Sequence, residues 1–477
     1  MAQARIFDIY MLKYIAMKYY FWILGCAMNY SDAERMATIL DSLGYTKTDV
    51  EREADLFIVI SCSVRESAML RIYGKVKELI EYKRNNTKFK TILTGCVLEK
   101  DQKKLKRVFD ILMTMEDLPK LPEMLKNATP SPSSSLVANP GISLDPSDLS
   151  SVDLVKMGVN PNLRKDDSGE YENYLSIIPK YQSHFRAYVP ISTGCDNFCS
   201  YCAVPYTKGR EKSRPSAEIV SEIKNLVDNG FKEITLLGQN VNSYGHDISG
   251  NKRDNSPFIH LLLELDTIAG DHRIYFYSNH PKDMTDELIV TLAKLKHFPH
   301  YIHLPLQSGN NEILRNMNRH NTREEYLQLV KKIKNAIPDV NLTTDIIVGY
   351  PGETEKQFND TADVMQQAEY DMAFIAQYSP RPGTVSAKQE DDATKEEKVR
   401  REKVLQKIVA ETVLEHNRKL VGTTQKILID EQKGNKYFGR TEGYKVVEIE
   451  TDQPLKIGQY IKAVIKSTTS WKLIGKI

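Results

Sequence analysis

Short apolar runs alternate with amphipathic helical patterns along the first part of the chain. The strand-like runs cover residues 19–24, 55–60 and 91–94, and helical stretches follow from near Ser31, Arg65 and Glu99. Alternating strands and helices are typical of an open, mostly parallel sheet with helices on its faces. We therefore predict an N-terminal α/β domain with an open parallel sheet over residues 17–128.

The same alternation resumes after a connector of different composition. Residues 129–184 are rich in Pro, Ser, Asn and Gly, which indicates an exposed connector. Strand-like runs then cover residues 187–193, 233–237, 273–277, 301–304, 341–348 and 372–378, with helical patterns such as 216–227 and 322–336 between them. Six β/α units of this kind predict a partial (β/α)6 parallel barrel over residues 185–412.

The last part of the chain shows a third pattern. A helix with a solvated charged face is predicted over residues 394–420. Short β segments follow at 425–429, 444–449, 460–465 and 472–474, which predicts a small β-barrel of oligonucleotide-binding type over residues 413–477. Its interleaved basic and aromatic residues suit RNA phosphates and stacked bases, although each fits ordinary surface or barrel core equally well. They are Lys433, Lys436, Arg440, Lys445, Lys462, Lys466 and Lys472, with Tyr437, Phe438, Tyr444 and Trp471.

Composition narrows the class of protein. The chain has 477 residues, 41% hydrophobic and 27% charged, which is ordinary for a soluble globular protein of two or three domains. The net charge of +2 neither supports nor excludes RNA as a partner. Six cysteines are too few and too scattered for a disulfide scaffold, so we expect a reducing, cytoplasmic location. The apolar stretch within residues 1–16 is too short and too charged to span a membrane; we assign it no function and expect no membrane partner.

Three closely spaced cysteines carry the clearest chemical signal. Cys195, Cys199 and Cys202 form a C-x3-C-x2-C triplet directly after the first predicted barrel strand. Three thiolates can hold a cubane iron–sulfur cluster by three of its irons, which leaves the fourth iron open to a substrate or cofactor. The alternative is zinc or structural cysteine, but structural zinc prefers four ligands and no His stands close enough in sequence to complete the set.

A second set of cysteines follows the three strands of the N-terminal domain. Cys26, Cys62 and Cys96 each come directly after one predicted strand. Ligands of open α/β sheets collect beyond the carboxyl ends of the strands, so these three residues can converge although they are far apart in sequence. This predicts a second three-thiolate site. The alternative is that the cysteines are buried small hydrophobic residues, which is common for one cysteine and less so for three at equivalent positions.

With both cysteine sets in place, the chain resembles the radical S-adenosylmethionine methylthiotransferases from about residue 17 to its end. Within them it is most similar to the group that modifies N6-dimethylallyladenosine in tRNA. The resemblance rests on the cysteine triplet and on motifs that occur in one order: Gly25-Cys-Ala-Met-Asn29, Cys62-Ser-Val-Arg-Glu66, Gly95-Cys-Val97, Tyr206-Thr-Lys-Gly-Arg-Glu-Lys-Ser-Arg-Pro215, Leu237-Gly-Gln-Asn-Val-Asn242, Leu304-Pro-Leu-Gln-Ser-Gly309 and Gly349-Tyr-Pro-Gly-Glu-Thr354.

The resemblance implies two [4Fe-4S] clusters with different roles. The cluster on Cys195, Cys199 and Cys202 would bind S-adenosylmethionine at its open iron, and reductive cleavage would give a 5′-deoxyadenosyl radical. The auxiliary cluster on the other three cysteines would carry the sulfur of the methylthio group, and a second S-adenosylmethionine would supply the methyl. The product would be methylthiolated at carbon 2 of the N6-dimethylallyladenosine next to the anticodon, at about position 37 of tRNA, once that base has left its stack.

The resemblance also implies partners and further site residues. The C-terminal barrel resembles the TRAM domain and would hold the tRNA. An electron donor of the flavodoxin or ferredoxin type and an iron–sulfur carrier are expected. Around S-adenosylmethionine we expect Gln239, Asn240 and Asn242 from one strand end, together with Arg214, although each could equally order its loop.

The chain departs from the family pattern at a few positions. Ala27 replaces the usual Gln after the first cysteine, Ile60 and Ser61 replace the common Asn-Thr, and Lys208 stands where Arg is typical. None of these changes removes a cluster ligand. Because Lys cannot reproduce the planar fork of Arg, the change at Lys208 puts a detailed substrate contact in doubt more than the reaction class. The connector over residues 129–184 also looks longer than usual.

Two other functions remain open at this point. The same reaction could act on N6-threonylcarbamoyladenosine in tRNA or on an aspartate of a ribosomal protein, although the stretches around Cys62 and Asn240 resemble the dimethylallyladenosine group more. A different class is a non-catalytic iron–sulfur protein that binds RNA or transfers electrons. Three cysteines per site argue against that class, because its clusters would be fully ligated by protein.

Overall fold

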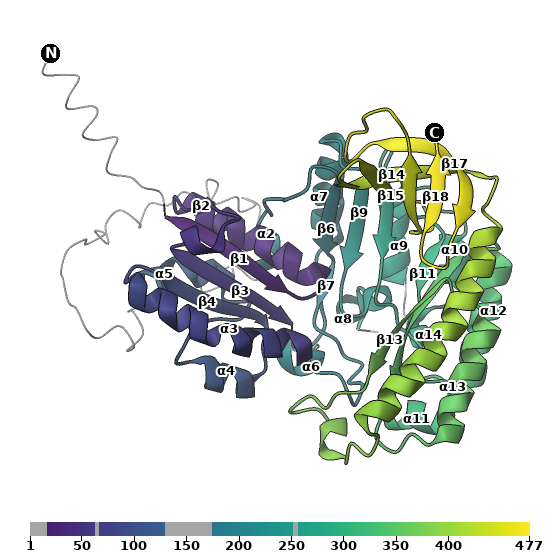
Figure 1. Ribbon diagram of the computed structural model, residues 1–477, viewed down its shortest axis with the longest axis horizontal. Coiled ribbons are helices and arrows are strands. Elements are labelled where there is room, and N and C mark those ends of the chain that lie inside the picture. Colours follow the sequence, from purple (N-terminus) through teal and green to yellow (C-terminus); the bar gives the residue numbers. More distant parts are fainter. Residues whose placement is uncertain (1–16, 63–65, 129–173, 251–255) are drawn as a thin grey trace, which may run out of the picture. The chain divides into compact units, whose positions relative to one another are not determined.

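The computed structural model describes residues 17–62, 66–128, 174–250 and 256–477. The chain divides into two compact units, residues 1–182 and residues 183–477 (Figure 1). The predicted N-terminal extension and most of the predicted connector lie outside the described residues. Within the described ranges, no helix combines the length and the apolar character that a membrane crossing requires.

The first unit contains the open parallel sheet predicted from the sequence. The strand order is β2-β1-β3-β4-β5, and every neighbouring pair is parallel. The central strand β3 is buried along its whole length, as expected for a parallel strand covered on both faces. The strands are β1 (Lys18–Leu24), β2 (Thr46–Lys47), β3 (Leu56–Cys62), β4 (Lys90–Cys96) and β5 (Ile111–Leu112).

Two apolar clusters fix the helices on opposite faces of this sheet. Ile58 and Ile60 of β3 pack with one cluster that includes α2, whereas Phe57 and Val59 pack with another that includes α3. Alternate residues of a strand point to opposite faces, so one apolar run builds both cores. The helices are α2 (Ala27–Ser42), α3 (Glu66–Asn85), α4 (Glu99–Leu105) and α5 (Leu121–Asn127). Helix α2 begins four residues before the predicted Ser31, directly after Cys26.

The second unit begins with six parallel strands, which are the predicted partial barrel. They form two three-stranded sheets, β10-β9-β6 and β11-β12-β13. The strands are β6 (Arg186–Pro190), β9 (Glu233–Leu237), β10 (Arg273–Phe276), β11 (Tyr301–His303), β12 (Asn341–Val348) and β13 (Met372–Gln377). The predicted strand over 187–193 is divided, because Ser192 and Thr193 leave β6 as β7 (Ser192–Thr193) and pair with β8 (Lys212–Ser213).

Helices follow the strands in chain order and cover one face of each sheet (Figure 1). They are α6 (Val204–Thr207), α7 (Ser216–Asp228), α8 (His246–Ser249), α9 (Ser256–Asp266), α10 (Asp286–Leu292), α11 (Asn311–Asn316), α12 (Arg323–Ala336), α13 (Glu355–Ala368) and α14 (Lys395–Arg418). The hydroxyls of Tyr326 of α12 and Thr344 both donate to the Leu304 carbonyl, at 2.8 and 3.0 Å, so Thr344 faces the helices. Its neighbours Thr343 and Asp345 therefore face the interior of the barrel.

The chain ends in the predicted small β-barrel, which is closed in the order β14-β15-β16-β18-β17. Its strands are β14 (Thr424–Lys433), β15 (Lys436–Arg440), β16 (Val446–Glu450), β17 (Tyr460–Thr468) and β18 (Leu473–Lys476). The sequence did not predict β15, whose Gly439 lies so close to β14 that a Cβ atom would meet Leu428 O at 2.5 Å. The predicted strand at 444–449 begins later, because Tyr444 has a φ of 63° and belongs to a turn.

The small barrel is fastened to the amino-terminal ends of the parallel strands. Glu233, at the start of β9, is fully buried and forms ion pairs with Arg273, at 2.6 Å, and with Arg186. Arg186 also contacts Asp430 of β14 at 3.0 Å, and Arg273 donates to the Thr441 carbonyl at 3.1 Å. The ring of Tyr444 packs 5.1 Å from that of Tyr275. The cysteine triplet follows the opposite, carboxyl-terminal end of β6.

Candidate functional site

The cysteine triplet lies in a loop that the β7–β8 pair closes at its base. Thr193 pairs with Lys212, and the backbone N–H of Cys195 donates to the Gly209 carbonyl at 3.2 Å. Gly194 has a φ of 77°, and a Cβ atom there would meet the Arg210 carbonyl oxygen at 2.0 Å. Only glycine fits this close approach of two backbones. The local fold therefore brings both ends of the cysteine loop together at the mouth of the barrel.

A turn after helix α11 holds the middle of the cysteine loop. The backbone N–H of Ser200 donates to the Met317 carbonyl at 3.0 Å. The side-chain amide of Asn318 donates to the carbonyls of Asn197 and Phe198 at 3.2 and 3.0 Å. Both Phe198 and Asn318 have left-handed backbone conformations, with φ of 49° and 56°. Asn tolerates this conformation better than most residues, which explains its place in this turn.

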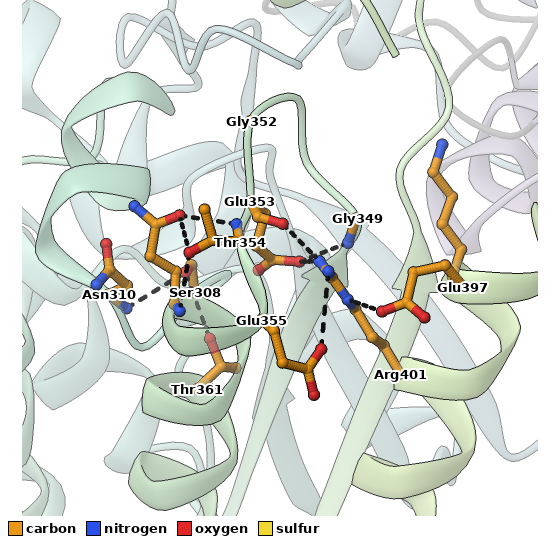
Figure 2. A network of polar contacts seen from close by, with 12 residues as sticks. Ser308, Asn310, Gly349, Gly352, Glu353, Thr354, Glu355, Thr361, Glu397 and Arg401 are labelled. Atoms are coloured by element: carbon orange, nitrogen blue, oxygen red, sulfur yellow. Dashed lines mark hydrogen bonds and ion pairs between the residues drawn. The ribbon is translucent and has the colours of Figure 1, made fainter. Parts of the chain in front are cut away.

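The motif over residues 349–354 fixes the same loop from another side. The hydroxyls of Tyr350 and Ser200 are 2.8 Å apart. The neighbouring Glu353 carboxylate accepts from the Gly349 N–H at 2.7 Å and from Arg401 of α14 at 2.8 Å (Figure 2). Burial raises the pKa of Glu353 although Arg401 opposes the shift. These residues order the strand end at the barrel mouth, so the motif is architectural here.

The motif that ends at Gly309 is built in the same way. The Gly309 N–H donates to the Thr361 hydroxyl at 2.9 Å, and a Cβ atom at residue 309 would meet Thr361 Cα at 2.5 Å. Asn310 caps α11 and donates to Asp360 of α13 at 2.7 Å. This network sets the start of α11, and thereby the turn that holds the cysteine loop.

The thiols of the triplet are buried in a way that disfavours their charge. Burial raises the pKa of Cys195 to about 11 and that of Cys202 to about 12. A bound metal would reverse this, because thiolates are the ligand form. No three His, Cys, Asp or Glu side chains of the described ranges converge on a single metal ion. A cubane places each thiolate on a different iron, so the three cysteines of this loop do not need to converge on one metal ion to hold it.

The second cysteine set lies at the carboxyl-terminal ends of neighbouring strands of the first sheet. Cys62 and Cys96 are register partners at the carboxyl ends of the adjacent parallel strands β3 and β4. Cys26 follows β1, the other neighbour of β3, and precedes α2. The buried Asn29 accepts from the Cys26 N–H at 3.0 Å and donates to the Ser61 carbonyl at 3.3 Å. Its amide thus connects two of the strand ends that carry cysteines.

A cavity of about 630 Å³ adjoins the cysteine triplet. Its lining comes from the cysteine loop, from Glu211 directly before β8, and from the segments that follow β9, β10 and α11. It contains four carboxylates and one lysine, and its lining residues are Asp196, Asn197, Glu211, Asn240, Ser243, His246, Asp247, Lys282, Asp283, Thr285 and His320. An excess of carboxylates favours a ligand that carries positive charge.

Buried polar atoms without hydrogen-bond partners among the described residues lie on the segments after β9 and β10, which contribute to the lining of this cavity. They include Asn240 Oδ1, Gln239 Oε1, Asn279 Oδ1 and His280 Nε2. His280 Nδ1 accepts from the Lys282 N–H at 3.2 Å, so its Nε2 carries the hydrogen of the neutral ring. Burial holds the pKa of His280 well below its usual value. Unsatisfied buried acceptors and a donor indicate a polar ligand, because each costs free energy when it stays unpaired.

The four residues predicted around S-adenosylmethionine take different positions. Asn240 lines the cavity and donates to Asp283 at 2.8 Å. Gln239 has the unpartnered oxygen described above. Asn242 exchanges hydrogen bonds with the backbone of His280 and orders its loop. Arg214 pairs with Glu222 at 2.9 Å and donates to the Pro190 carbonyl. Of these four described residues, Asn240 alone is on the cavity wall.

Glu211 is a cavity residue that the sequence analysis passed over. Its carboxylate accepts from the Ser243 hydroxyl at 2.7 Å. Burial raises the pKa of Glu211 to about 7, and the neighbouring carboxylates of Asp247 and Asp283 act in the same direction. The sequence signal was its place inside the motif after the triplet, but only the fold shows the burial and the acidic neighbours.

The basic and aromatic residues of the small barrel divide into two groups. Lys433, Lys436, Lys462, Lys466 and Trp471 are exposed. Tyr437 is a core residue, Tyr444 packs against the parallel strands, and Lys445 pairs with Asp371 at 2.8 Å. Lys436 and Lys472 both pair with Glu448, and Lys433 lies over the ring of Phe438. The exposed group remains available for an RNA partner.

Three family descriptions match the chain, each over one part of it. Residues 18–115 match the uncharacterized protein family UPF0004, residues 189–365 match the radical SAM superfamily, and residues 418–477 match the TRAM domain. The first match covers the five-stranded sheet and the last covers the closed barrel. The radical SAM match contains the cysteine triplet and all of the cavity lining.

Curated relatives match nearly the whole chain. A tRNA-2-methylthio-N(6)-dimethylallyladenosine synthase from Caldicellulosiruptor saccharolyticus is 39% identical over 466 residues, which is 96% of this chain and 92% of the relative. A protein of the same name from Clostridium novyi is 39% identical over 464 residues, 95% of each chain. The structure of the radical S-adenosylmethionine methyltransferase TsrM from Kitasatospora setae, with tryptophan and an S-adenosylmethionine analog, matches with a TM-score of 0.50. It covers 88% of this chain and 79% of that one at 14% identity, a likeness of fold alone.

Proposed function

Because this chain belongs to the family of tRNA-2-methylthio-N6-dimethylallyladenosine synthases, we propose that it adds a methylthio group to carbon 2 of N6-dimethylallyladenosine next to the anticodon of tRNA. The protein is a radical S-adenosylmethionine methylthiotransferase, and its RNA substrate is a tRNA. The observation that carries the proposal is the cysteine triplet at the carboxyl end of the first barrel strand, beside an acidic cavity with unsatisfied polar atoms.

The family uses S-adenosylmethionine and a [4Fe-4S] cluster, and the residues present fit both. We assign one cluster to Cys195, Cys199 and Cys202, and a second, auxiliary cluster to Cys26, Cys62 and Cys96. When bound, the first supplies the electron that cleaves S-adenosylmethionine and the second supplies the sulfur. The chain itself holds the two loops in place: the turn at Asn318 orders the first, and Asn29 orders the second.

The cavity beside the triplet suits the polar parts of S-adenosylmethionine. Its ammonium and sulfonium groups carry positive charge, which the carboxylates of Glu211 and Asp283 favour. The unpartnered oxygens of Gln239 and Asn240 can accept from amino or hydroxyl groups, and His280 Nε2 can donate. The residues therefore bind and orient this substrate, while the reactive electron chemistry belongs to the cluster.

An apolar side chain inside the barrel suits the dimethylallyl group. Phe374 of β13 is the register partner of Asp345, and its ring centre lies 6.0 Å from that of His303. His303 bonds to both Thr343 and Asp345, so all four side chains share the interior face. Phe374 nevertheless stays 53% exposed. We assign this exposed ring to the wall that receives the N6 substituent of the extruded base.

The remaining partners follow from the same reaction. We propose that the exposed lysines and Trp471 of the small barrel bind the tRNA backbone and its bases. A reductase partner of the flavodoxin or ferredoxin type would supply electrons, and an iron–sulfur carrier would restore the auxiliary cluster. We also propose a cytoplasmic location, where tRNA and reducing conditions coincide.

Mass spectrometry of tRNA nucleosides tests the proposed function. The cluster-reconstituted protein is incubated without oxygen with S-adenosylmethionine, a reductant and tRNA that bears either dimethylallyladenosine or threonylcarbamoyladenosine. We expect a methylthio product from the first tRNA only. Product from the second tRNA only would move the substrate to threonylcarbamoyladenosine. Release of 5′-deoxyadenosine with neither product would point to a protein substrate.

A further inference from the structure

Arg319 is a buried arginine that contacts the cysteine triplet and that the reaction described above does not use. Its residue is 9% exposed, and it follows the turn that holds the cysteine loop. One terminal nitrogen, Nη2, donates to the Pro305 carbonyl at 2.7 Å, and the other, Nη1, lies 3.6 Å from Cys199 Sγ in hydrogen-bond geometry. The guanidinium thus joins the end of β11 to a predicted cluster ligand.

The turn around Arg319 fixes the direction of this contact. The Arg319 N–H donates to the Leu314 carbonyl at 2.9 Å, and the preceding Asn318 is in the left-handed conformation. Asn318 donates to two carbonyls of the cysteine loop, and Met317 accepts from Ser200. Backbone and side chain of one short segment therefore hold the loop, while the guanidinium reaches the sulfur itself. Four hydrogen bonds of residues 317–319 thus anchor this segment, which fixes the direction in which the guanidinium leaves it.

A buried cation next to a thiolate changes the reduction potential of the metal cluster that the thiolate binds. A charge–charge contact is much stronger in a low-dielectric interior than in water. Hydrogen bonds to the ligand sulfurs are among the factors that set the potential of an iron–sulfur cluster. Reduction adds a negative charge to the cluster, so a neighbouring guanidinium stabilises the reduced state more than the oxidised state. Its removal should lower the reduction potential.

We propose that Arg319 is a positioning residue that fixes Cys199 and raises the reduction potential of the cluster held by the cysteine triplet. This inference rests on the proposed function, because it takes Cys199 as a cluster ligand. A higher reduction potential makes it easier to reduce the cluster before S-adenosylmethionine is cleaved. A purely structural arginine would hold the loop without changing the potential.

The test is a redox titration followed by electron paramagnetic resonance on the full-length, cluster-reconstituted protein. The cluster of interest is the one whose signal changes when S-adenosylmethionine is added. The variants are Arg319→Gln, which removes the charge, Arg319→Lys, which keeps the charge but loses the fork, and Arg315→Gln. The last is the matched control, because Arg315 is an exposed arginine on the preceding helix α11.

We expect the Arg319→Gln variant to have a more negative midpoint potential than the parent. At a fixed potential its ratio of reduced to oxidised cluster should fall about tenfold, which is about 59 mV for a one-electron couple. Arg319→Lys should fall between this variant and the parent, because one ammonium cannot bond to Pro305 and the sulfur together. Arg315→Gln should match the parent.

Two results separate the failure of this inference from failure of the proposed function. An Arg319→Gln potential equal to the parent's, with the response to S-adenosylmethionine intact, overturns the inference and leaves Arg319 a structural residue. A parent protein without any signal that responds to S-adenosylmethionine contradicts the proposed function instead. If Arg319→Gln retains no iron, the titration uses Arg319→Met, which also removes the charge: a negative shift supports the inference, and a potential equal to the parent's overturns it.

Discussion

Truncation of Phe374 tests where the substrate's N6 substituent is bound. Phe374 is 53% exposed although it lies on the interior face of β13, so more than half of its surface is free to contact a ligand. A fully buried Phe covers roughly 200 Å², so about 100 Å² is available here. At about 25 cal/mol per Å², complete coverage by an apolar group is worth about 2.5 kcal/mol. A planar dimethylallyl group covers only part of the ring, so about 1 kcal/mol is the lower limit.

The Phe374→Ala variant should therefore lose about 5- to 70-fold in kcat/KM for tRNA that bears dimethylallyladenosine. Methylthio product is measured by nucleoside mass spectrometry at several tRNA concentrations. Formation of 5′-deoxyadenosine without tRNA should stay near the parent rate, because the residue belongs to the substrate wall and not to the cysteine loop. Leu263→Ala is the matched control, because Leu263 on helix α9 is also about half exposed.

Folding provides a separate check on the same variant. Because Phe374 is more than half exposed in the free protein, its truncation should cost less than about 1 kcal/mol in unfolding free energy. Urea denaturation of Phe374→Ala and Leu263→Ala should give similar midpoints. Equal kcat/KM for the two variants on the same tRNA would refute the assignment of Phe374 to the substrate wall.

Three further predictions concern the clusters, the cavity and the junction with the small barrel. Cys195→Ala should abolish formation of 5′-deoxyadenosine, whereas Cys62→Ala should still form 5′-deoxyadenosine but no methylthio product. Both products are measured by chromatography. 5′-Deoxyadenosine from the first variant, or methylthio product from the second, contradicts the two-cluster assignment. The affinity for S-adenosylmethionine should rise as pH rises through about 7, because Glu211 ionises there and attracts the cationic ligand. Equilibrium dialysis of Glu211→Gln should give a flat profile, and an unchanged rise would exclude Glu211 as the cause. Glu233→Ala should destabilise the protein by about 3–5 kcal/mol in urea, because buried Arg273 loses its carboxylate; a cost below about 1 kcal/mol would contradict this.

The sequence predicted those features that depend on local apolar patterns. The run 55–60 is buried from Leu56 onward, so its apolar composition identifies a central parallel strand, and Cys62 and Cys96 fall at equivalent strand ends. The small barrel was also predicted from local patterns, because its short β segments are apolar. Where the strand pattern is weak, as in β15 with its Gly439 and charged ends, local composition did not identify the element.

The sequence did not reveal features that depend on contacts between distant segments. Arg319 and Cys199 are 120 residues apart, and nothing in the local pattern shows that this arginine is buried. The raised pKa of Glu211 depends on burial and on carboxylates from other segments. Asn240 and Asn242 are both asparagines of one motif, yet Asn240 lines the cavity whereas Asn242 orders a loop. Register and burial decide such roles, and both require the fold.

The junction between the small barrel and the parallel strands constrains how RNA reaches the site. Its anchors are a fully buried carboxylate with two arginines and a turn that places Tyr444 against Tyr275. Breaking such a desolvated ion pair costs several kcal/mol, so the small barrel does not swing freely on the strands. The distance between its exposed lysines and the cysteine triplet is therefore nearly fixed. A tRNA that binds these lysines, as we propose, therefore has to span this nearly fixed distance to bring its adenosine to the barrel mouth.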